Sequence, residues 1–296
     1  MLSAEEVVAL ARAEGLGHVA DDLVGRVRPG WRLVPSGDSA RVGTSKVGGS
    51  PDLAEGEPWP SSERGIPMGF VAQIDCSAIP PLAPEWRDRV RPWEHGDGLI
   101  RLFANVLEDY EVGAARALVC DPRAPLTRQP APPAEPGDGE QLYGLPETAV
   151  RLEPFLTAPE MHPVLRPDLD RFDKLAEGYL QWAYRLRIDG AANDDSTAVD
   201  PWEVHHLLGE GTSVQDDVRH VGSMLHEDAG AWEYERHGPA DPALAHADAW
   251  QILLGLHMDD RLRLEIFDGG ALHILAPVTD LAAGRLDRLV FATSSG

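Results

Sequence analysis

Apolar residues follow a helical period at the N-terminus and again near the middle of the chain. Ser3-Ala-Glu-Glu6 has the spacing of a capping box and precedes an apolar stripe, which predicts a helix over about residues 4–14. Gly15 follows as a natural helix end, because glycine readily takes the left-handed conformation. A second short helix is predicted within residues 18–27, and helical spacing between residues 169 and 183 predicts a third, longer one.

Most of the remaining apolar residues fall in short runs bounded by Gly, Pro, Asn and Asp, as is typical of strands joined by turns. Asp268-Gly269-Gly270 suits the centre of a hairpin, because a tight hairpin turn needs positive φ. We therefore predict an α+β fold with mostly antiparallel sheets and a few flanking helices. The predicted strands cover residues 31–35, 69–75, 98–105, 115–120, 150–155, 250–258, 262–266 and 287–292.

The chain divides into two similar parts. Residues 1–125 are predicted to form an N-terminal half, 126–148 a Pro/Gly-rich loop or linker and 149–296 a C-terminal half, together one compact unit. Each half contains a glycine loop, a strand that ends in Asp and a strand led by Gly. Either an internal duplication or chance similarity explains this echo; a duplication would place a groove between the halves. The matched segments are 48–51 with 209–212, 70–75 with 254–259, and 98–103 with 270–275.

The formal net charge of −23 narrows the range of partners. A field of that sign repels nucleic-acid phosphates and anionic lipid and attracts basic partners, although a highly charged surface also serves solubility alone. No window approaches 18 consecutive apolar residues, and the N-terminus lacks a basic segment followed by an apolar one. We therefore expect a cytoplasmic protein that binds neither nucleic acid nor membrane, with Cys76 and Cys120 reduced.

The sequence contains no recognisable cofactor motif, and no cofactor, metal ligand or catalytic residue is predicted. Phosphate-binding loops, dinucleotide fingerprints, nucleophile elbows and zinc-protease motifs are absent from it. One polar cluster could form a metal site or an acid–base pair, or simply a solvated helix cap. Neighbouring histidines in a strand point to opposite faces, which argues against one shared ion. The cluster consists of His205, His206, Glu210, Gln215, Asp216 and Asp217.

The segment from Ser45 to Leu53 is the most distinctive in the chain. Two adjacent glycines, Gly48 and Gly49, allow positive φ or a close approach of another backbone, and Pro51 sets the exit direction. The pattern Lys-x-Gly-Gly-x-Pro-x-Leu is followed by Trp-Pro and by Phe-x-Ala-Gln-Ile-Asp. This series resembles the YwqG-like family of bacterial proteins, whose biochemical function is unassigned.

The resemblance implies a function in protein binding. The family is similar to a wider group that includes the programmed cell death protein 2 relatives, which act as protein-binding chaperones, and its bacterial members are suspected of toxin-immunity roles. We therefore expect a chaperone- or immunity-type protein that holds a peptide or protein segment, with a basic partner favoured by charge. The alternative is a metal-assisted hydrolase built on His205, His206, Asp216 and Asp217.

Candidate binding residues follow from the same segments. For Asp75 the alternative is a structural hydrogen bond to the turn that follows it, and Trp59 is expected to plug the core under the loop. The family pattern aromatic-Gly-Asp-x-Gly is changed here to Phe267-Asp268-Gly269-Gly270. The predicted binding residues are Lys46, Gly48, Gly49, Pro51, Gln73, Asp75, His206, Gln215, Asp216 and Asp268.

Overall fold

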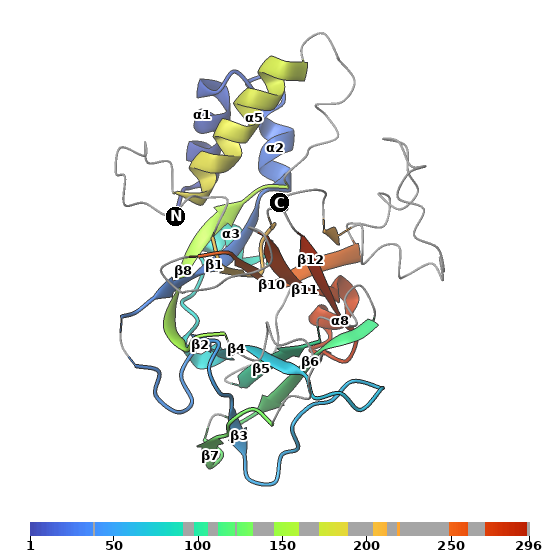
Figure 1. The fold of residues 1–296 in the computed structure, drawn as a ribbon. Coiled ribbons are helices and arrows are strands. Elements are labelled where there is room, and N and C mark those ends of the chain that lie inside the picture. Colours follow the sequence, from blue (N-terminus) through green and yellow to red (C-terminus); the bar gives the residue numbers. More distant parts are fainter. Residues whose placement is uncertain are drawn as a thin grey trace.

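Ten strands close into one antiparallel barrel in the computed structural model of the chain (Figure 1). Neighbouring strands follow the order β1-β8-β2-β4-β5-β6-β12-β11-β10-β9, and β9 pairs with β1. With the helices described below, this confirms the predicted α+β class with mostly antiparallel strands. The structure describes residues 1–37, 39–90, 98–105, 112–121, 123–132, 145–159, 172–188, 204–211, 218–219, 249–259 and 270–294.

Most barrel strands lie where the hydrophobic pattern predicts them, but several are longer. The first strand begins three residues before the predicted Trp31, and the strand predicted over 150–155 extends at both ends. The predicted strand 262–266 lies outside the described residues. The barrel strands are β1 (Arg28–Pro35), β2 (Lys46–Val47), β4 (Gly69–Asp75), β5 (Leu99–Ala104), β6 (Val112–Cys120), β8 (Thr148–Thr157), β9 (His206–Leu207), β10 (Trp250–His257), β11 (Ala271–Pro277) and β12 (Leu289–Ser294).

Two further strands, β3 (Asp52–Ala54) and β7 (Leu126–Arg128), form a small separate sheet. Helices α1 (Ala4–Ala13), α2 (Ala20–Arg26) and α5 (Phe172–Arg187) gather beyond one end of β1 and β8 (Figure 1). The predicted capping box is present, since Glu6 N–H donates to Ser3 Oγ and Ser3 N–H to Glu6. Short helices also follow two of the barrel strands: α3 (Pro84–Arg87) and α8 (Val278–Ala282), with the 3-10 turn η1 (Cys76–Ala78).

The barrel consists of two repeats related by a pseudo-two-fold axis. The first repeat contains β1, β2, β4, β5 and β6, and the second contains β8, β9, β10, β11 and β12. The initial strand of each repeat pairs with the second strand of the other, because β1 pairs with β9 and β8 with β2. The same backbone bonds recur in both, for example Gly48 N–H to Val71 O at 2.9 Å and Leu208 N–H to Leu253 O at 3.0 Å.

The strand registers show that the pseudo-two-fold axis passes through two pairs of facing residues. Lys46 pairs with Ala149 and His206 with Arg32, so Ala149 and Arg32 are equivalent. Two residues further along, Arg151 is equivalent to Val34, and these two residues pair with each other. On the other side of the barrel, Arg101 of β5 is equivalent to His273 of β11. The pairings of β5 with β6 and of β11 with β12 then make Ala115 equivalent to Leu289, and these two residues also pair with each other. Residues that pair with their own equivalents lie on the axis.

The register corrects two of the three sequence matches between the halves. Gly98–Phe103 does correspond to Gly270–Leu275, since Phe103 and Leu275 occupy equivalent positions next to Phe70 and Ile252. Consequently 70–75 corresponds to 252–257, two residues before the predicted segment. The glycine loop is shifted by one: Gly48 corresponds to Leu208 and Gly49 to Gly209. A bulge in each repeat, at Val71 and Leu253, preserves the spacing of both strands.

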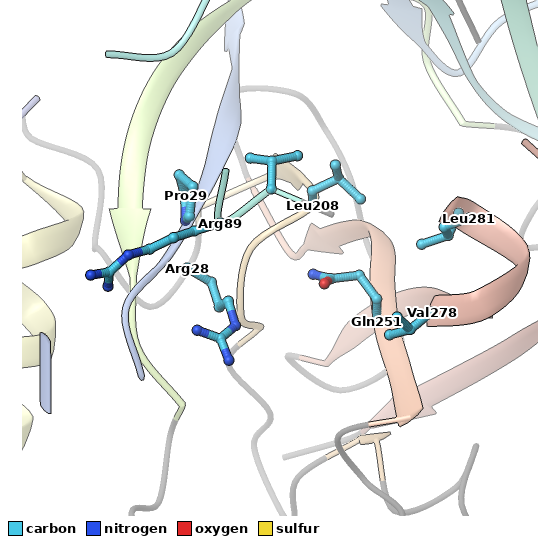
Figure 2. A pocket seen from close by; sticks show the side chains of 8 residues that line it. Arg28, Pro29, Arg89, Leu208, Gln251, Val278 and Leu281 are labelled. Carbon is cyan, nitrogen blue, oxygen red and sulfur yellow. The ribbon is translucent and has the colours of Figure 1, made fainter. Parts of the chain in front are cut away.

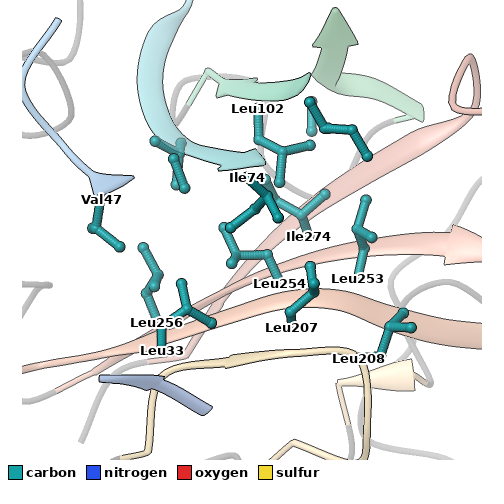
Figure 3. Close-up of a cluster of buried hydrophobic side chains, with 14 of the residues drawn as sticks. Leu33, Val47, Ile74, Leu102, Leu207, Leu208, Leu253, Leu254, Leu256 and Ile274 are labelled. Atoms are coloured by element: carbon teal, nitrogen blue, oxygen red, sulfur yellow. The ribbon is translucent and has the colours of Figure 1, made fainter. Parts of the chain in front are cut away.

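Buried aliphatic side chains from both repeats fill the barrel (Figure 3). Ile74 and Leu102 come from the first repeat and Leu254 and Ile274 from the second, and all four are fully buried. The outer wall of β10 is also covered, so seven of its eight residues are buried and Gln251 alone is half-buried. The residues of this strand therefore do not alternate between buried and exposed, because both faces of the strand are packed.

The helices pack on one another and on the end of β8. Val7 and Leu10 of α1 meet Tyr179 and Trp182 of α5 and Leu156 of β8 in one buried cluster. Among the helices that the structure describes, none has the length and apolar character needed to cross a bilayer. Cys76 and Cys120 are both free thiols, as predicted, and burial raises the pKa of Cys120.

Candidate functional site

The first glycine loop, residues 48–51, is a close-packed backbone junction. Gly48 and Gly49 have φ of 66° and 72°, a region that glycine enters without steric cost. A Cβ on Gly48 would lie 2.6 Å from Leu145 O and closer still to Pro146 O, so the segment entering β8 leaves no room for a side chain. Gly49 N–H donates to Leu145 O at 2.7 Å. Both predicted glycines thus seat one backbone on another, and Pro51 is buried beside them.

Lys46, predicted as a binding residue, is fully buried and belongs to an ion network. Its ammonium lies 3.1 Å from Glu147 Oε2 and 3.7 Å from Asp52 Oδ1, and it donates to Ser50 O. Arg128 joins the same carboxylates, at 2.9 Å from Asp52 and 3.0 Å from Glu147. The network ties β2 to β3, β7 and the segment before β8.

Neutralisation explains how these charges persist in the interior. Burial lowers the pKa of Lys46, while Asp52 and Glu147 act in the opposite direction. Burial alone would raise the pKa of Asp52, but hydrogen bonds from Arg128, Gln73 and Gly43 outweigh it and the pKa falls below its ordinary value. The lowered pKa keeps Asp52 ionised at neutral pH.

Gln73 and Asp75 also serve their own fold in this structure. Gln73 is fully buried, accepts from Asp52 N–H at 3.0 Å and donates to Asp52 Oδ2 and to Thr44 O, each at 2.8 Å. Asp75 accepts from Ser77 N–H at 3.0 Å, the turn hydrogen bond that the sequence allowed as an alternative to binding. Trp59 is partly buried, packs edge-on against Phe103 and donates to Met68 O.

The second glycine loop, residues 208–211, has a different occupant at the critical position. Leu208 has φ of 56°, the positive region in which a residue with a side chain is strained, and it stands where the first repeat has Gly48. Gly209 retains the glycine of its equivalent, with φ of 84°. At this second loop the glycine that allows the close approach is on the opposing strand β1. It is Gly30, the equivalent of Glu147, and a Cβ on it would lie 2.7 Å from Leu208 O.

His206 replaces Lys46 in the second repeat. Its Nδ1 lies 2.7 Å from Leu208 O, which makes Nδ1 the protonated nitrogen, and Nε2 has no hydrogen-bond partner in the part of the chain that the structure describes. Gly255 replaces Gln73, and a Cβ there would lie 2.9 Å from ring carbons of His206. A glycine within this strand therefore makes room for the imidazole.

Three buried imidazoles lie in a row on this outer wall. The His257 ring centroid is 6.4 Å from that of His206 and 5.7 Å from that of His273, which replaces Arg101 of the first repeat. Burial, with the nearby charge of Arg187, lowers the pKa of His206 to about 3. The pKa of His257 is also well below its ordinary value, chiefly because of burial. The rings of His206 and His257 are therefore neutral at neutral pH.

His205 is held separately from His206. Its Nε2 lies 3.2 Å from Asp259 Oδ2, and its Nδ1 accepts from His257 N–H at 3.1 Å. Among the described residues no group of three His, Cys, Asp or Glu side chains could hold a metal ion. Gln215, Asp216, Asp217 and Asp268 lie outside the described residues, so their predicted roles have no structural counterpart here.

A small pocket opens beside the second glycine loop (Figure 2). We call it the junction pocket, because its lining comes from both halves of the chain. Arg28 and Gln251 contribute its polar groups from the starts of β1 and β10, and the stem of Arg89 crosses one side. The remaining lining is Pro29, Val90, Leu208, Val278 and Leu281.

Sequence reasoning missed the junction pocket, although one signal for it exists. Arg28-Pro29-Gly30 and Leu145-Pro146-Glu147 enter the two repeats at equivalent positions, and each carries a proline at its centre. A match of Pro29 with Pro146 would have pointed to Arg28 as the counterpart of a buried leucine. The segments are short: Arg28-Pro29-Gly30 opens β1, and Leu145-Pro146-Glu147 lies just before β8.

A family profile described as "Domain of unknown function (DUF1963)" matches residues 45–294. The chain belongs to this family. The DUF1963 match contains nine of the barrel strands and begins after β1, the strand that carries Arg28 and Pro29. No curated protein matches the chain.

Proposed function

We propose that this DUF1963 protein is a YwqG-like binding protein of the cytoplasm that holds a segment of another polypeptide at the junction pocket. The observation that supports it most directly is the difference between the repeats. The site beside Gly48 is filled by backbone and by ion pairs, whereas the equivalent site beside Leu208 is an open pocket. Pockets between related units are common places for ligands.

The charge of the chain favours a basic partner. A net charge of −23 attracts a basic polypeptide over long range and speeds its encounter, and salt weakens that attraction. The resemblance of residues 45–80 to the YwqG-like family, and more distantly to the programmed cell death protein 2 group, supports the same class of function.

Site-specific photocross-linking in the native cell tests this proposal. A photoreactive residue replaces half-buried Val278 on the rim of the pocket, and a matched control carries it at exposed Val119 on β6. We expect a polypeptide adduct formed from position 278 and not from 119, with a yield that falls as salt rises. Identical adducts from both positions, or none from 278, would refute binding at this site.

A further inference from the structure

Arg28 and Arg89 differ from most of the other arginines that are at least partly buried. Arg28 donates only to Gly25 O and Val27 O, while Arg89 donates to Val24 O and lies over the Trp86 ring at 4.8 Å. Within the described parts of the chain neither has a carboxylate at ion-pair distance, although both line the junction pocket. The arginines that do have a carboxylate at ion-pair distance are Arg26, Arg32, Arg101, Arg128, Arg185 and Arg219.

This gap is unexpected in a chain with 49 acidic and 26 basic residues. Carboxylates outnumber cations almost two to one, yet none among the described residues forms an ion pair with either guanidinium, and Glu85 acts on Arg89 only from a longer distance. The positive charge of Arg28 also acts on Arg89, whose pKa is lowered by burial and by that neighbour. Two partly buried like charges favour an anion between or beside them.

The junction at the first glycine loop shows what a closed version of this site looks like. Leu145, the equivalent of Arg28, is buried in the barrel core, and its carbonyl oxygen lies against Gly48. At the second glycine loop the position of the leucine is taken by Arg28 of β1, and the position of the glycine by Leu208, whose strained backbone turns a side chain toward the pocket. The second junction therefore has an apolar wall and a cation where the first junction is filled by Leu145.

The lining selects a ligand with an anionic head, an apolar body and an amide. Arg28 retains unused N–H groups for a carboxylate, and Leu208, Val278 and Leu281 supply apolar contacts. Gln251 donates to Gly209 O at 2.9 Å, which leaves its Oε1 available to accept an N–H group.

We propose that the junction pocket captures the C-terminal residue of a partner polypeptide. The terminal carboxylate binds Arg28, an apolar last side chain packs against Leu208 and Leu281, and the last amide N–H donates to Gln251. This rests on the proposed function and adds to it the part of the partner that is recognised. It is compatible with a basic partner, because the terminal carboxylate is present whatever the charge of the remaining chain.

Calorimetric titration of the full chain tests the capture. The probe is an acetylated Gly-Gly-Lys-Ala-Leu peptide with a free terminal carboxylate, compared with the same peptide as a terminal amide, with hexanoate and with inorganic phosphate. A charge-assisted bidentate contact leads us to expect binding about tenfold to a hundredfold tighter for the acid than for the amide. Arg28→Leu should remove that difference, whereas Arg151→Leu, on an exposed ion pair, should keep it.

The remaining outcomes each decide the matter. Val278→Trp should fill the pocket and weaken the acid and the amide together, with thermal unfolding used to confirm that each variant is folded. Equal affinity for acid and amide, an undiminished affinity in Arg28→Leu, or hexanoate or phosphate binding as tightly as the peptide acid would overturn the proposal. If the titration gives one of these results but the photocross-link from position 278 still forms, the proposed function is retained and only the capture of a terminal residue is refuted.

Discussion

The two repeats share one backbone plan but differ in what occupies it. In the first, Lys46, Gln73 and Arg101 are buried on the outer wall and paired with Asp52, Glu57 and Glu147. In the second, His206, Gly255 and His273 stand at the same positions, and a pocket opens nearby. A saturated ion network is rigid and has no capacity for a partner, whereas neutral rings and an open rim leave room for one.

The comparison teaches that the sequence motif and the candidate site belong to different repeats. The motif that carries the family resemblance lies in the first repeat, where its shape follows from packing: no side chain fits on Gly48, and Lys46 is fully buried. The junction pocket lies at the second glycine loop, where the same motif is degenerate and where the start of β1 completes the lining. Four changes, given below from the largest expected effect to the smallest, test that contrast.

Gly48→Ala should break the first repeat. The added Cβ meets the Leu145 and Pro146 carbonyl oxygens, and the residue must also hold positive φ, so we expect a loss of about 4 kcal/mol or more in the free energy of unfolding. Gly56→Ala is the matched control, since φ there is 77° and no atom lies within 4 Å of a Cβ. It should cost about 1–2 kcal/mol. Equal losses in denaturant unfolding would contradict close packing at Gly48.

Lys46→Met should be nearly as damaging. It removes the fully buried cation shared by Asp52 and Glu147 and leaves them with the partly exposed Arg128, and breaking a buried pair on one side typically costs about 3–5 kcal/mol. The control is Arg151→Met, which removes an exposed pair with Glu153 and should cost about 0–1 kcal/mol. If urea unfolding shows similar midpoints for both variants, the network does not stabilise the first repeat.

Acid should weaken the second repeat before the first. His206 has an ordinary pKa near 6.5 when unfolded and about 3 when folded, so the unfolded chain binds the proton first. Stability contributed by its neutral form is present above pH 6.5 and is lost as the pH falls toward 3, by up to about 1.4 kcal/mol per pH unit. Asp52, with a lowered pKa, loses its contribution only at pH values below its ordinary 3.8.

The variant His206→Asn isolates that slope. Asparagine retains a donor for Leu208 O and does not titrate, so the stability of the variant should depend less on pH between 6.5 and 3. Guanidinium unfolding at a series of pH values measures the slope, and Arg187, His205, His257 and His273 are the neighbouring charges or rings that remain. An unchanged slope would mean that His206 is not the group that resists protonation.

Arg28→Leu should have the smallest effect on stability. It installs the leucine found at the equivalent position 145 and removes only two hydrogen bonds to backbone carbonyls. We expect a change within about 1 kcal/mol in the free energy of unfolding, since a partly exposed arginine without an ion pair contributes little. A loss of several kcal/mol would show that Arg28 holds the helices to the barrel.

Several elements could be predicted from local sequence because their causes are local. The capping box at Ser3 and Glu6 is satisfied within one turn, and β4 occupies the predicted residues 69–75. The single register that was right, Gly98–Phe103 with Gly270–Leu275, joins two strands led by glycine. The other two matches were misplaced, the glycine loop by one residue and the strand by two. The loop was misplaced because a match between glycines passes over Leu208, which has positive φ. The strand was misplaced because apolar residues match almost equally well at several positions along an apolar strand.

The candidate site could be predicted less well than the fold. Gln73 and Asp75 were chosen for polarity near a glycine loop, yet their hydrogen-bond partners come from Asp52, Thr44 and Ser77. Arg28 and Leu208 attracted no attention, because a single arginine and a single leucine carry no pattern. Only a comparison of equivalent positions in the two repeats distinguishes them.

By itself the sequence determined the α+β class, the strand-rich order, the long helix and the existence of an echo between the halves. These follow from periodicity and turn chemistry, which act over a few residues. The tertiary structure alone decided that β1 and β8 exchange partners across the two-fold axis, and so which residues meet. Contacts between Lys46 and Glu147, or between Arg28 and the second glycine loop, join residues about a hundred positions or more apart, and chain closure rather than local preference sets them.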